Sequence, residues 1–429
     1  MNWLLRYRCR TFLRSSMCAI PIACMAAALI AAPLIRSIDQ RTQWTLLHFG
    51  IEGSRLVVAA LASSLLTFIV FAFSMVLLAV QIAGGQYSPR IIARILESYT
   101  VKLTLGAFVF AFTYALAALG RIEDRVPQLP VLVAVLLSLF SIALFLYLIQ
   151  KTGQALRPIT MLSRVATDTR AVIQAVYPIP FLKLMGEDPG PDFDSVPATH
   201  TIVHNGRSGA VLAFDATGLV KIAERASLTI ELIPQVGDYL ATGEDFFRLH
   251  GPSAGAVDDD SLRRCVALGP ERALEKDIAF GFRILVDIAS KALSPAINDP
   301  TTGVLALDQI EHLLHLLSQR QLGTGVVRDP SGQVRLLYRT PHWEDYVTLA
   351  VTEIRVYGAA NPQVTRRLQA MLEKLVQVVP AERTGALCKE MMLLGRTIER
   401  VFSDPEDRIL AGAADSQGFG GRQPAHSAR

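Results

Sequence analysis

Charged side chains are absent from four long stretches near the start of this 429-residue chain. The uncharged stretches cover residues 15–35, 56–89, 103–120 and 126–150. A helix needs roughly 20 apolar residues to cross about 30 Å of hydrocarbon, and inside a bilayer it must satisfy its own backbone hydrogen bonds. The lack of charge therefore predicts a bundle of four transmembrane helices and excludes a wholly soluble chain.

Paired cysteines and the common catalytic motifs are also absent. The five cysteines form no CxxC pair, so we expect no disulfide framework. The chain has no GxGxxG dinucleotide loop, no phosphate-binding loop, no GxSxG elbow and no kinase-type set. Lys221 lacks the flanking methionines of a lysine that carries a swinging-arm cofactor. We therefore predict no catalytic residues, no metal and no cofactor, and we favour a protein that is not an enzyme.

Basic residues between the uncharged stretches predict the orientation. One face of the membrane receives most of them: Arg6, Arg8, Arg10, Arg14, Arg90, Arg94, Lys102, Lys151, Arg157, Arg164 and Arg170. The opposite face receives Arg36, Arg41, Arg55, Arg121 and Arg125. The positive-inside rule then predicts a multi-pass protein of the bacterial inner membrane with both termini in the cytoplasm. An alternative for the first stretch is a secretory signal that is cleaved near Ala32.

The net charge of +4 and the pI near 8.8 come partly from these flanking arginines. They indicate contact with anionic headgroups, so the expected partner is the lipid bilayer and no nucleic acid is expected. We also expect a homo-oligomer, with a small-molecule or ion ligand that the sequence does not identify.

Periodicity divides the chain into six parts. We predict a basic cytoplasmic N-terminus at 1–14 and a transmembrane domain at 15–150, with spans at about 15–35, 56–84, 103–120 and 129–150. An exit helix and a Pro-rich linker occupy 151–198, and alternating apolar residues at 199–250 predict a small β module of barrel or sandwich type. A helical cytoplasmic domain covers 251–403, in which apolar residues recur every three or four positions at 274–292 and at 307–317 and predict the buried faces of two helices. Residues 404–429 are predicted to form a disordered tail. The fold class is thus a membrane helical bundle followed by a cytoplasmic α+β region.

Two motifs carry a resemblance to a known family. Residues 85–90 read GQYSPR at the end of the second stretch, and residues 291–300 read KALSPAINDP, preceded by FGFR at 280–283. The pair resembles the bacterial family of predicted membrane proteins called domain of unknown function 2254. The resemblance covers nearly the whole chain up to about Phe402. It implies a four-span protein with a cytoplasmic domain, and it supplies no activity or catalytic residue.

The second motif contains the candidate ligand site. Asp299 followed by Pro300 is typical of a helix start, with Asp as the N-cap and Pro as the first helical residue, so helix capping is the simpler interpretation. The functional alternative is a ligand site built from Lys291, Asn298 and Asp299. Arg283, Asp287 and Lys291 follow at spacing four, which is typical of a solvated face or an ion-pair ladder and, as an alternative, of an anion clamp.

Histidines and carboxylates share one stripe of the helix predicted to begin at Asp299, namely Asp308, Glu311, His312 and His315. The stripe lies opposite the leucines of the same helix and offers no third ligand, so we interpret it as solvent-facing rather than zinc-binding.

Thr67, Ser74 and Gln81 recur at spacing seven in the second stretch. Helix packing through small and hydroxyl side chains is one explanation, and a polar pore lining is the other. The best functional hypothesis is a channel-like or transport-associated protein that its cytoplasmic domain regulates. A membrane-anchored scaffold or ligand sensor without a pore is the alternative, and an unrecognised membrane-bound enzyme is the third.

Overall fold

The computed structural model describes residues 3–7, 16–42, 50–86, 99–122, 127–181 and 198–417. The chain divides into two compact units, Cys9–Thr160 and Met161–Arg429 together with Met1–Arg8. We call them the span unit and the C-terminal unit. Several predicted features lie outside the described residues: 87–90 of the first family motif, most of the Pro-rich linker, the basic residues Arg8, Arg10, Arg14, Arg90 and Arg94, and 418–429 of the tail.

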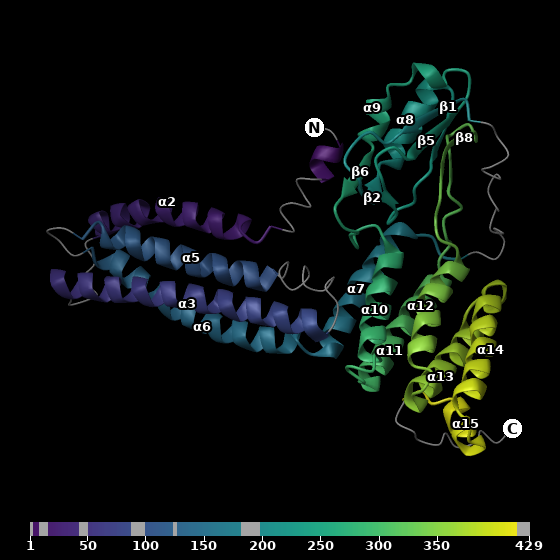
Figure 1. Ribbon diagram of the computed structural model, residues 1–429. Coiled ribbons are helices and arrows are strands. Elements are labelled where there is room, and N and C mark those ends of the chain that lie inside the picture. The colour runs from purple at the N-terminus through teal and green to yellow at the C-terminus, as the bar shows by residue number, and fades with distance from the viewer. Residues whose placement is uncertain are drawn as a thin grey trace. The chain divides into compact units, whose positions relative to one another are not determined.

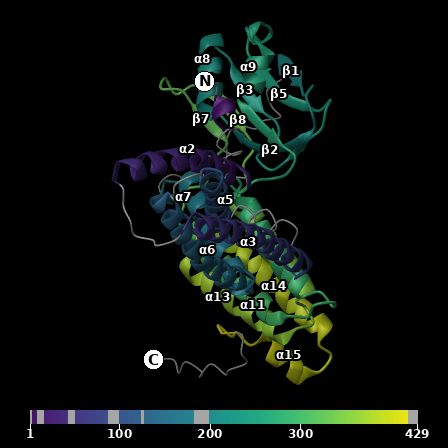
Figure 2. The same ribbon diagram turned by 90° about the vertical axis from the view of Figure 1, so that its left-hand side faces the viewer.

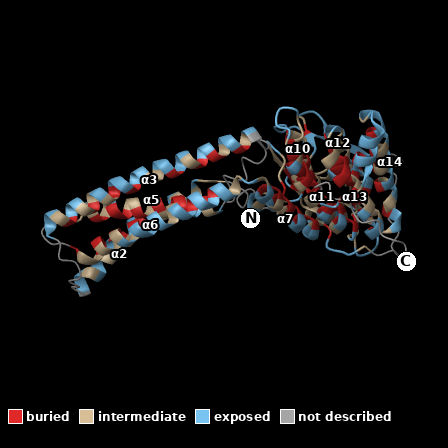
Figure 3. Ribbon diagram, turned by 90° about the horizontal axis from the view of Figure 1, so that it is seen from below, coloured by how far each residue is buried: buried red, intermediate tan, exposed pale blue. Residues whose placement is uncertain are grey.

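The described part of the span unit contains four helices: α2 (Ala19–Thr42), α3 (Ile51–Gln86), α5 (Tyr99–Leu119) and α6 (Gln128–Ala155) (Figure 1). Each is long and apolar enough to cross a membrane, which agrees with the four predicted spans. The window of α5 is 56% buried, against 22% or less in the other three, and α5 packs against α2, α3 and α6. Figure 3 shows the outer faces of this unit exposed, as expected for surfaces that meet lipid.

Small residues allow these helices to approach closely. A Cβ atom added to Gly106 of α5 would lie 3.0 Å from Cys24 Sγ of α2. Ala111 and Ala115 of α5 are buried against the apolar face of α3. Polar contacts hold the ends: the Leu129 amide at the start of α6 donates to Asp39 Oδ1 over 2.8 Å. Close packing of small residues and polar contacts at the helix ends thus hold the bundle together.

The described strands of the C-terminal unit form two sheets. The larger one has the order β1 (His200–Val203), β5 (Asp245–His250), β3 (Thr229–Leu232), β8 (Val334–Tyr338), β7 (Val326–Arg328). The smaller one has the order β4 (Tyr239–Leu240), β2 (Gly209–Phe214), β6 (Val266–Gly269). Helix α8 (Ala216–Ala226) joins β2 to β3, and its Leu219 and Ala223 are buried in the apolar core of the two sheets. The short helix α9 (Asp259–Arg263) precedes β6.

The prediction of a small β module of barrel type at 199–250 needs correction. The described strands do not close into a barrel, because they form two separate sheets. Strand β8 joins β3 in parallel across about 100 residues of chain, pairing Ile230 with Leu336. The sheets thus take β6, β7 and β8 from the region predicted to be helical. A local alternation of apolar residues signals single strands, but it carries no information on a partner so distant in sequence.

Seven helices complete the described part of the C-terminal unit: α7 (Pro158–Val176), α10 (Ile278–Ala292), α11 (Pro300–Ser318), α12 (Trp343–Tyr357), α13 (Pro362–Val378), α14 (Thr384–Val401) and α15 (Pro405–Gly412). Within this unit the sheets gather at one end and α10 to α14 at the other (Figures 1 and 2). The predicted apolar stripes of α10 and α11 are confirmed, since Phe282, Leu285, Ile310 and Leu314 are fully buried.

The beginning of the predicted disordered tail is folded. Asp404 caps α15 by accepting from the Glu406 amide. The Thr365 hydroxyl of α13 donates to the Ala411 carbonyl, and Arg366 pairs with Asp415 at 3.4 Å. Both members of that pair are buried. The composition of this segment suggested disorder, whereas a cap and a buried ion pair hold it on α13.

Candidate functional site

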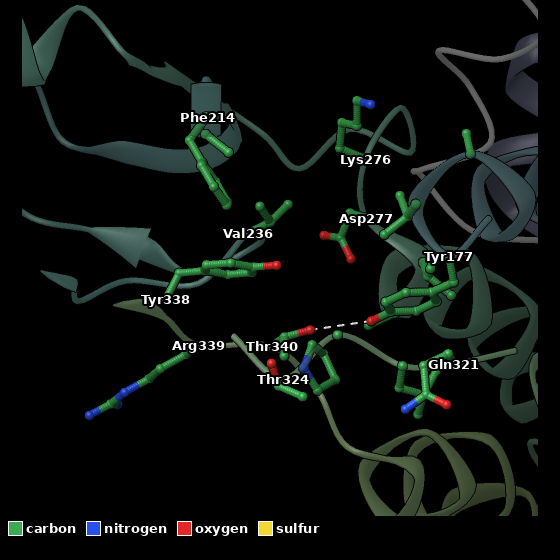
Figure 4. A pocket seen from close by; sticks show the side chains of 18 of the residues that line it. Tyr177, Phe214, Val236, Lys276, Asp277, Gln321, Thr324, Tyr338, Arg339 and Thr340 are labelled. Carbon is green, nitrogen blue, oxygen red and sulfur yellow. Dashed lines mark hydrogen bonds between the residues drawn. The ribbon is translucent and has the colours of Figure 1, made fainter. Parts of the chain in front are cut away.

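A cavity of about 790 Å³ lies in the C-terminal unit where the sheets meet the helices (Figure 4). Its walls come from the end of α7, the end of β2, the start of α10, the segment 321–324 and the connection from β8 to α12. This volume falls within the roughly 300–1,000 Å³ of small-molecule sites. Mostly apolar walls with a few polar groups are typical of such sites.

Tyr177 follows the last residue of α7 and ties that helix to the opposite wall. Its hydroxyl lies 3.2 Å from Thr340 Oγ1 (Figure 4) and 3.4 Å from the Tyr346 hydroxyl. Burial raises the pKa of Tyr346 well above its ordinary value, so this phenol stays protonated and neutral. The three hydroxyls form a neutral network that joins α7, the β8–α12 connection and α12.

Tyr338 and Phe214 form an aromatic wall, with ring centroids 5.0 Å apart. The Tyr338 hydroxyl points into the cavity (Figure 4) and has no hydrogen-bond partner among the described residues. Gly323 lies beside it: an added Cβ would be 3.5 Å from the Tyr338 hydroxyl and 3.7 Å from Tyr177 Cε1. A larger side chain at Gly323 would enter the space between the two tyrosines.

Asp277 is the buried carboxylate of the site, with 4% of its surface exposed. It caps α10 by accepting from the Phe280 amide at 2.8 Å, and it pairs with Arg272 at 2.7 Å. Burial raises the pKa of Asp277, and the Arg272 guanidinium opposes that effect. Gly237, with φ of +98°, permits this pair, because an added Cβ would lie 2.5 Å from Arg272 Nη2 and 2.6 Å from Asp277 Oδ2.

Two cations line the edge of the cavity. Lys276 and Arg339 are both exposed, and neither has an ion-pair partner among the described residues. Their side chains extend from different sides and do not converge on one point (Figure 4). Because Arg272 already compensates Asp277, the two free cations give the mouth of the cavity a positive field.

The segment after α7 is clamped to the wall of the cavity. The Gln321 amide donates to the Ile179 carbonyl and the Phe181 amide to the Gln319 carbonyl, both over 2.9 Å. The Arg320 side chain donates to the Pro178 carbonyl. Helix α7 is therefore held at the cavity by backbone hydrogen bonds as well as by Tyr177.

The predicted ladder on α10 is an ion-pair network. The Arg283 guanidinium forms a bidentate pair with Glu353 of α12, one bond of which is 2.6 Å, and its Nε donates to Asp287 Oδ1. The hydrogen bond from Arg283 lowers the pKa of Glu353 below its ordinary value. Arg283 thus joins α10 to α12 and has two carboxylates as partners.

Asn298 and Asp299 form the turn between α10 and α11. Asn298 has a φ of +48°, and the Asp299 amide donates to the Ala292 carbonyl. Asp299 accepts from the Thr302 amide at 3.1 Å and from the Thr302 hydroxyl at 2.6 Å. These contacts are those of a helix cap. Lys291 lies on the last turn of α10, and the five predicted ligand residues are all absent from the wall of the cavity.

The predicted pore-lining residues occupy the outer face of α3. Thr67, Ser74 and Gln81 are exposed, whereas Val58, Ala62, Leu65, Ala72 and Val76 of the same helix are buried. The Thr67 hydroxyl bonds to the Ser63 carbonyl and the Ser74 hydroxyl to the Val70 carbonyl. A path lined by these residues would therefore run beside a single bundle rather than through it.

The stripe of carboxylates and histidines on α11 faces α13 in part. Arg367 pairs with Asp308 at 2.8 Å and with Glu311 at 2.6 Å, and Lys374 reaches Glu311 as well. Burial pushes the pKa of Glu311 up, but hydrogen bonds from Lys374 and Arg367 outweigh this and leave it below the ordinary value. The prediction of a solvent-facing stripe was wrong for Glu311, because its partners on α13 are distant in sequence.

Sequence reasoning missed the residues of the cavity. One signal was present: Tyr177 precedes Pro178 at the end of a predicted helix, where a side chain can leave the helical surface. Asp277 caps α10, but its position beside Gly237 follows only from the fold, because about 40 residues separate the two in sequence.

Comparisons with known proteins agree with the apolar character of the four helices in the span unit. The family model described as "Predicted membrane protein (DUF2254)" matches residues 14–374. "Uncharacterized protein Mb1321c" of Mycobacterium bovis is 29% identical over 387 residues, which cover 86% of this chain and 73% of that protein. "Uncharacterized protein Rv1290c" of Mycobacterium tuberculosis shows the same identity and coverage. No solved structure gives a significant match.

Proposed function

This chain belongs to the family of predicted membrane proteins called domain of unknown function 2254, and we propose that it is a membrane-anchored sensor. Its C-terminal unit binds a small molecule in the cavity, and binding changes the arrangement of the membrane-spanning helices. The proposal includes the topology expected from the basic residues, with the C-terminal unit in the cytoplasm of a bacterial cell.

One observation carries the proposal: the cavity is walled by the end of the helix that follows the last span. Only Leu156 and Arg157 separate α6 from α7, and Tyr177 at the far end of α7 lines the cavity. A ligand that contacts Tyr177 therefore acts on a segment continuous in sequence with α6. Coupling of this kind requires that the ligand favour one arrangement of α7 over another.

The packing of α7 makes it suited to this role. Thr169 of α7 lies against Gly281 of α10, where an added Cβ would be 2.6 Å from Thr169 Cγ2. Asp277 at the start of α10 lines the same cavity as Tyr177. The adjoining ends of α7 and α10 thus both line the ligand site. Because the two helices are closely packed, a shift of one displaces the other.

Native mass spectrometry of the full chain tests ligand binding. A small molecule should copurify with the wild type and with Gly323→Ala, whose added methyl group makes ordinary contacts. Gly323→Leu should abolish copurification, because its side chain enters the space between Tyr177 and Tyr338. Hydrogen exchange then tests the relay: removing the molecule should speed exchange in α7 and alter it in α6. Equal occupancy of the leucine variant, or no occupancy of the wild type, would refute the sensor.

A transport-associated protein is the second candidate, and the outer face of α3 favours it. Thr67, Ser74 and Gln81 would line a path only between copies of the chain, so this candidate requires a homo-oligomer. Cysteines at the three positions, in a chain without its native cysteines, should then react with membrane-impermeant thiol reagents, while a cysteine in place of Ala72, which is fully buried in the bundle, should not. Uniform protection and no ion flux in liposomes would rule the path out.

A further inference from the structure

The cavity combines free cations at its mouth with aromatic and hydroxyl groups inside. Lys276 and Arg339 have no ion-pair partner among the described residues and stay exposed. The Phe214 and Tyr338 rings supply flat apolar surface, to which Val236, Ile278 and Leu322 add aliphatic contacts. This arrangement suits a ligand with a flat apolar body and a negative charge at one end.

The interior offers neutral hydrogen bonds rather than a charge. Like the Tyr338 hydroxyl, the Thr324 hydroxyl has no partner in the described part of the chain. Asp277 is the carboxylate of the wall, and Arg272 and the Phe280 amide already occupy it. A cationic ligand would therefore compete with Arg272 for Asp277 and would meet Lys276 and Arg339 at the entrance.

We propose that the cavity binds an aromatic organic anion, whose ring lies against Phe214 and Tyr338 and whose charged group stays at the mouth near Lys276 and Arg339. This inference rests on the proposed ligand-binding role and adds the chemical class. Because the two cations lie apart and are exposed, they steer and weakly stabilise the anion rather than clamp it.

Calorimetric titration of the detergent-solubilised full chain with 2-naphthoate and with its neutral isostere 2-naphthamide tests the charge. Because Lys276 and Arg339 do not converge on one point, the carboxylate contacts one of them at a time, and that contact should contribute roughly 1.4- to fivefold in affinity. The double variant Lys276→Gln, Arg339→Gln should weaken 2-naphthoate by that factor and leave 2-naphthamide unchanged. Lys221→Gln, which removes an exposed cation of α8 away from the cavity, is the matched control and should change neither titration.

Three further measurements separate this inference from the proposed function. Tyr338→Phe should weaken both compounds, and Gly323→Leu should abolish both while Gly323→Ala retains them. Added salt should weaken 2-naphthoate alone. Equal affinity for the two compounds, both lost in Gly323→Leu, would overturn the anion class and leave the cavity a binding site. Binding that persists in Gly323→Leu, or no binding of 2-naphthoate to the wild type, would also overturn the inference, and copurification remains an independent test of the sensor.

Discussion

Replacing Gly281 with alanine should loosen the contact between α7 and α10. An added Cβ would lie 2.6 Å from Thr169 Cγ2 and 2.9 Å from Thr169 Cβ, and closer still to Oγ1. Thr169 is fully buried and its hydroxyl donates to the Val165 carbonyl at 2.7 Å, so rotating it away costs a hydrogen bond. Overpacking of this kind costs about 1–3 kcal/mol, and the better helix propensity of alanine returns about 1 kcal/mol. We expect a net loss of about 0–2 kcal/mol, which leaves the variant about 1–3 kcal/mol less stable than a glycine-to-alanine change that causes no clash.

Thermal unfolding of the full chain in detergent measures this loss, and a second substitution identifies its cause. Thr169→Ala in the Gly281→Ala background removes Oγ1 and Cγ2, the two side-chain atoms beyond Cβ, and should recover part of the stability. Gly385→Ala on α14 is the matched control, because an added Cβ there meets nothing within 4 Å. It should be neutral or slightly stabilising. If Gly281→Ala is as stable as Gly385→Ala, the close approach of α7 and α10 is not a constraint and the relay through α7 loses its basis.

Three further predictions concern capping, buried charge and pH. Asp299→Ser should be nearly neutral in thermal unfolding and Asp299→Ala should cost about 0.5–2 kcal/mol; loss of ligand binding in the stable serine variant would instead support the ligand-site alternative. Arg383 is buried, donates to three carbonyls at the end of α11 and stacks on Phe181 at 4.6 Å. Arg383→Lys should therefore lower the free energy of unfolding by about 1–3 kcal/mol, whereas the same change at exposed Arg396 should have no measurable effect. The hydrogen bond from Arg283 lowers the pKa of Glu353 below its ordinary value of 4.5. The ionised Glu353 therefore stabilises the fold fully above about pH 4.5, and this stabilisation is lost as the pH falls through the lowered pKa. The difference in melting temperature between the wild type and Glu353→Gln should therefore shrink on acidification below about pH 4.5, and a constant difference would contradict the pairing.

Local patterns in the sequence predicted the helices well. The absence of charge identified four spans, and the spacing of apolar residues identified the buried faces of α10 and α11. Asp299 and Pro300 marked the start of α11 to the residue. Each of these features depends on residues within one or two helical turns, so the sequence alone contains the necessary information.

The same reasoning failed in the sheets and at the site, because both depend on contacts between residues that are distant in sequence. Nothing near Ile230 indicates that its partner is Leu336, and nothing near Asp277 indicates that Gly237, about 40 residues earlier, will lie beside it. The free hydroxyl of Tyr338 likewise depends on which elements surround it. A cavity is built from residues on many elements, and their common position follows only from the fold.

The residues that resemble the family motif have structural roles that can be assigned one by one. In FGFR, Gly281 lets α7 approach α10 and Arg283 ties α10 to α12. In KALSPAINDP, Asn298 adopts a positive φ and Asp299 caps α11. The motif therefore fixes α10 against three neighbouring helices, with Asp277 and Tyr177 at the adjoining ends of α10 and α7. Substitutions in the motif should alter ligand binding through the position of these helices, whereas substitutions at Tyr338 or Lys276 should alter it by direct contact. A motif variant that keeps both its melting temperature and its ligand binding is compatible with this division. A motif variant that remains stable but loses ligand binding, while hydrogen exchange in α7 and α10 is unchanged, would contradict the division.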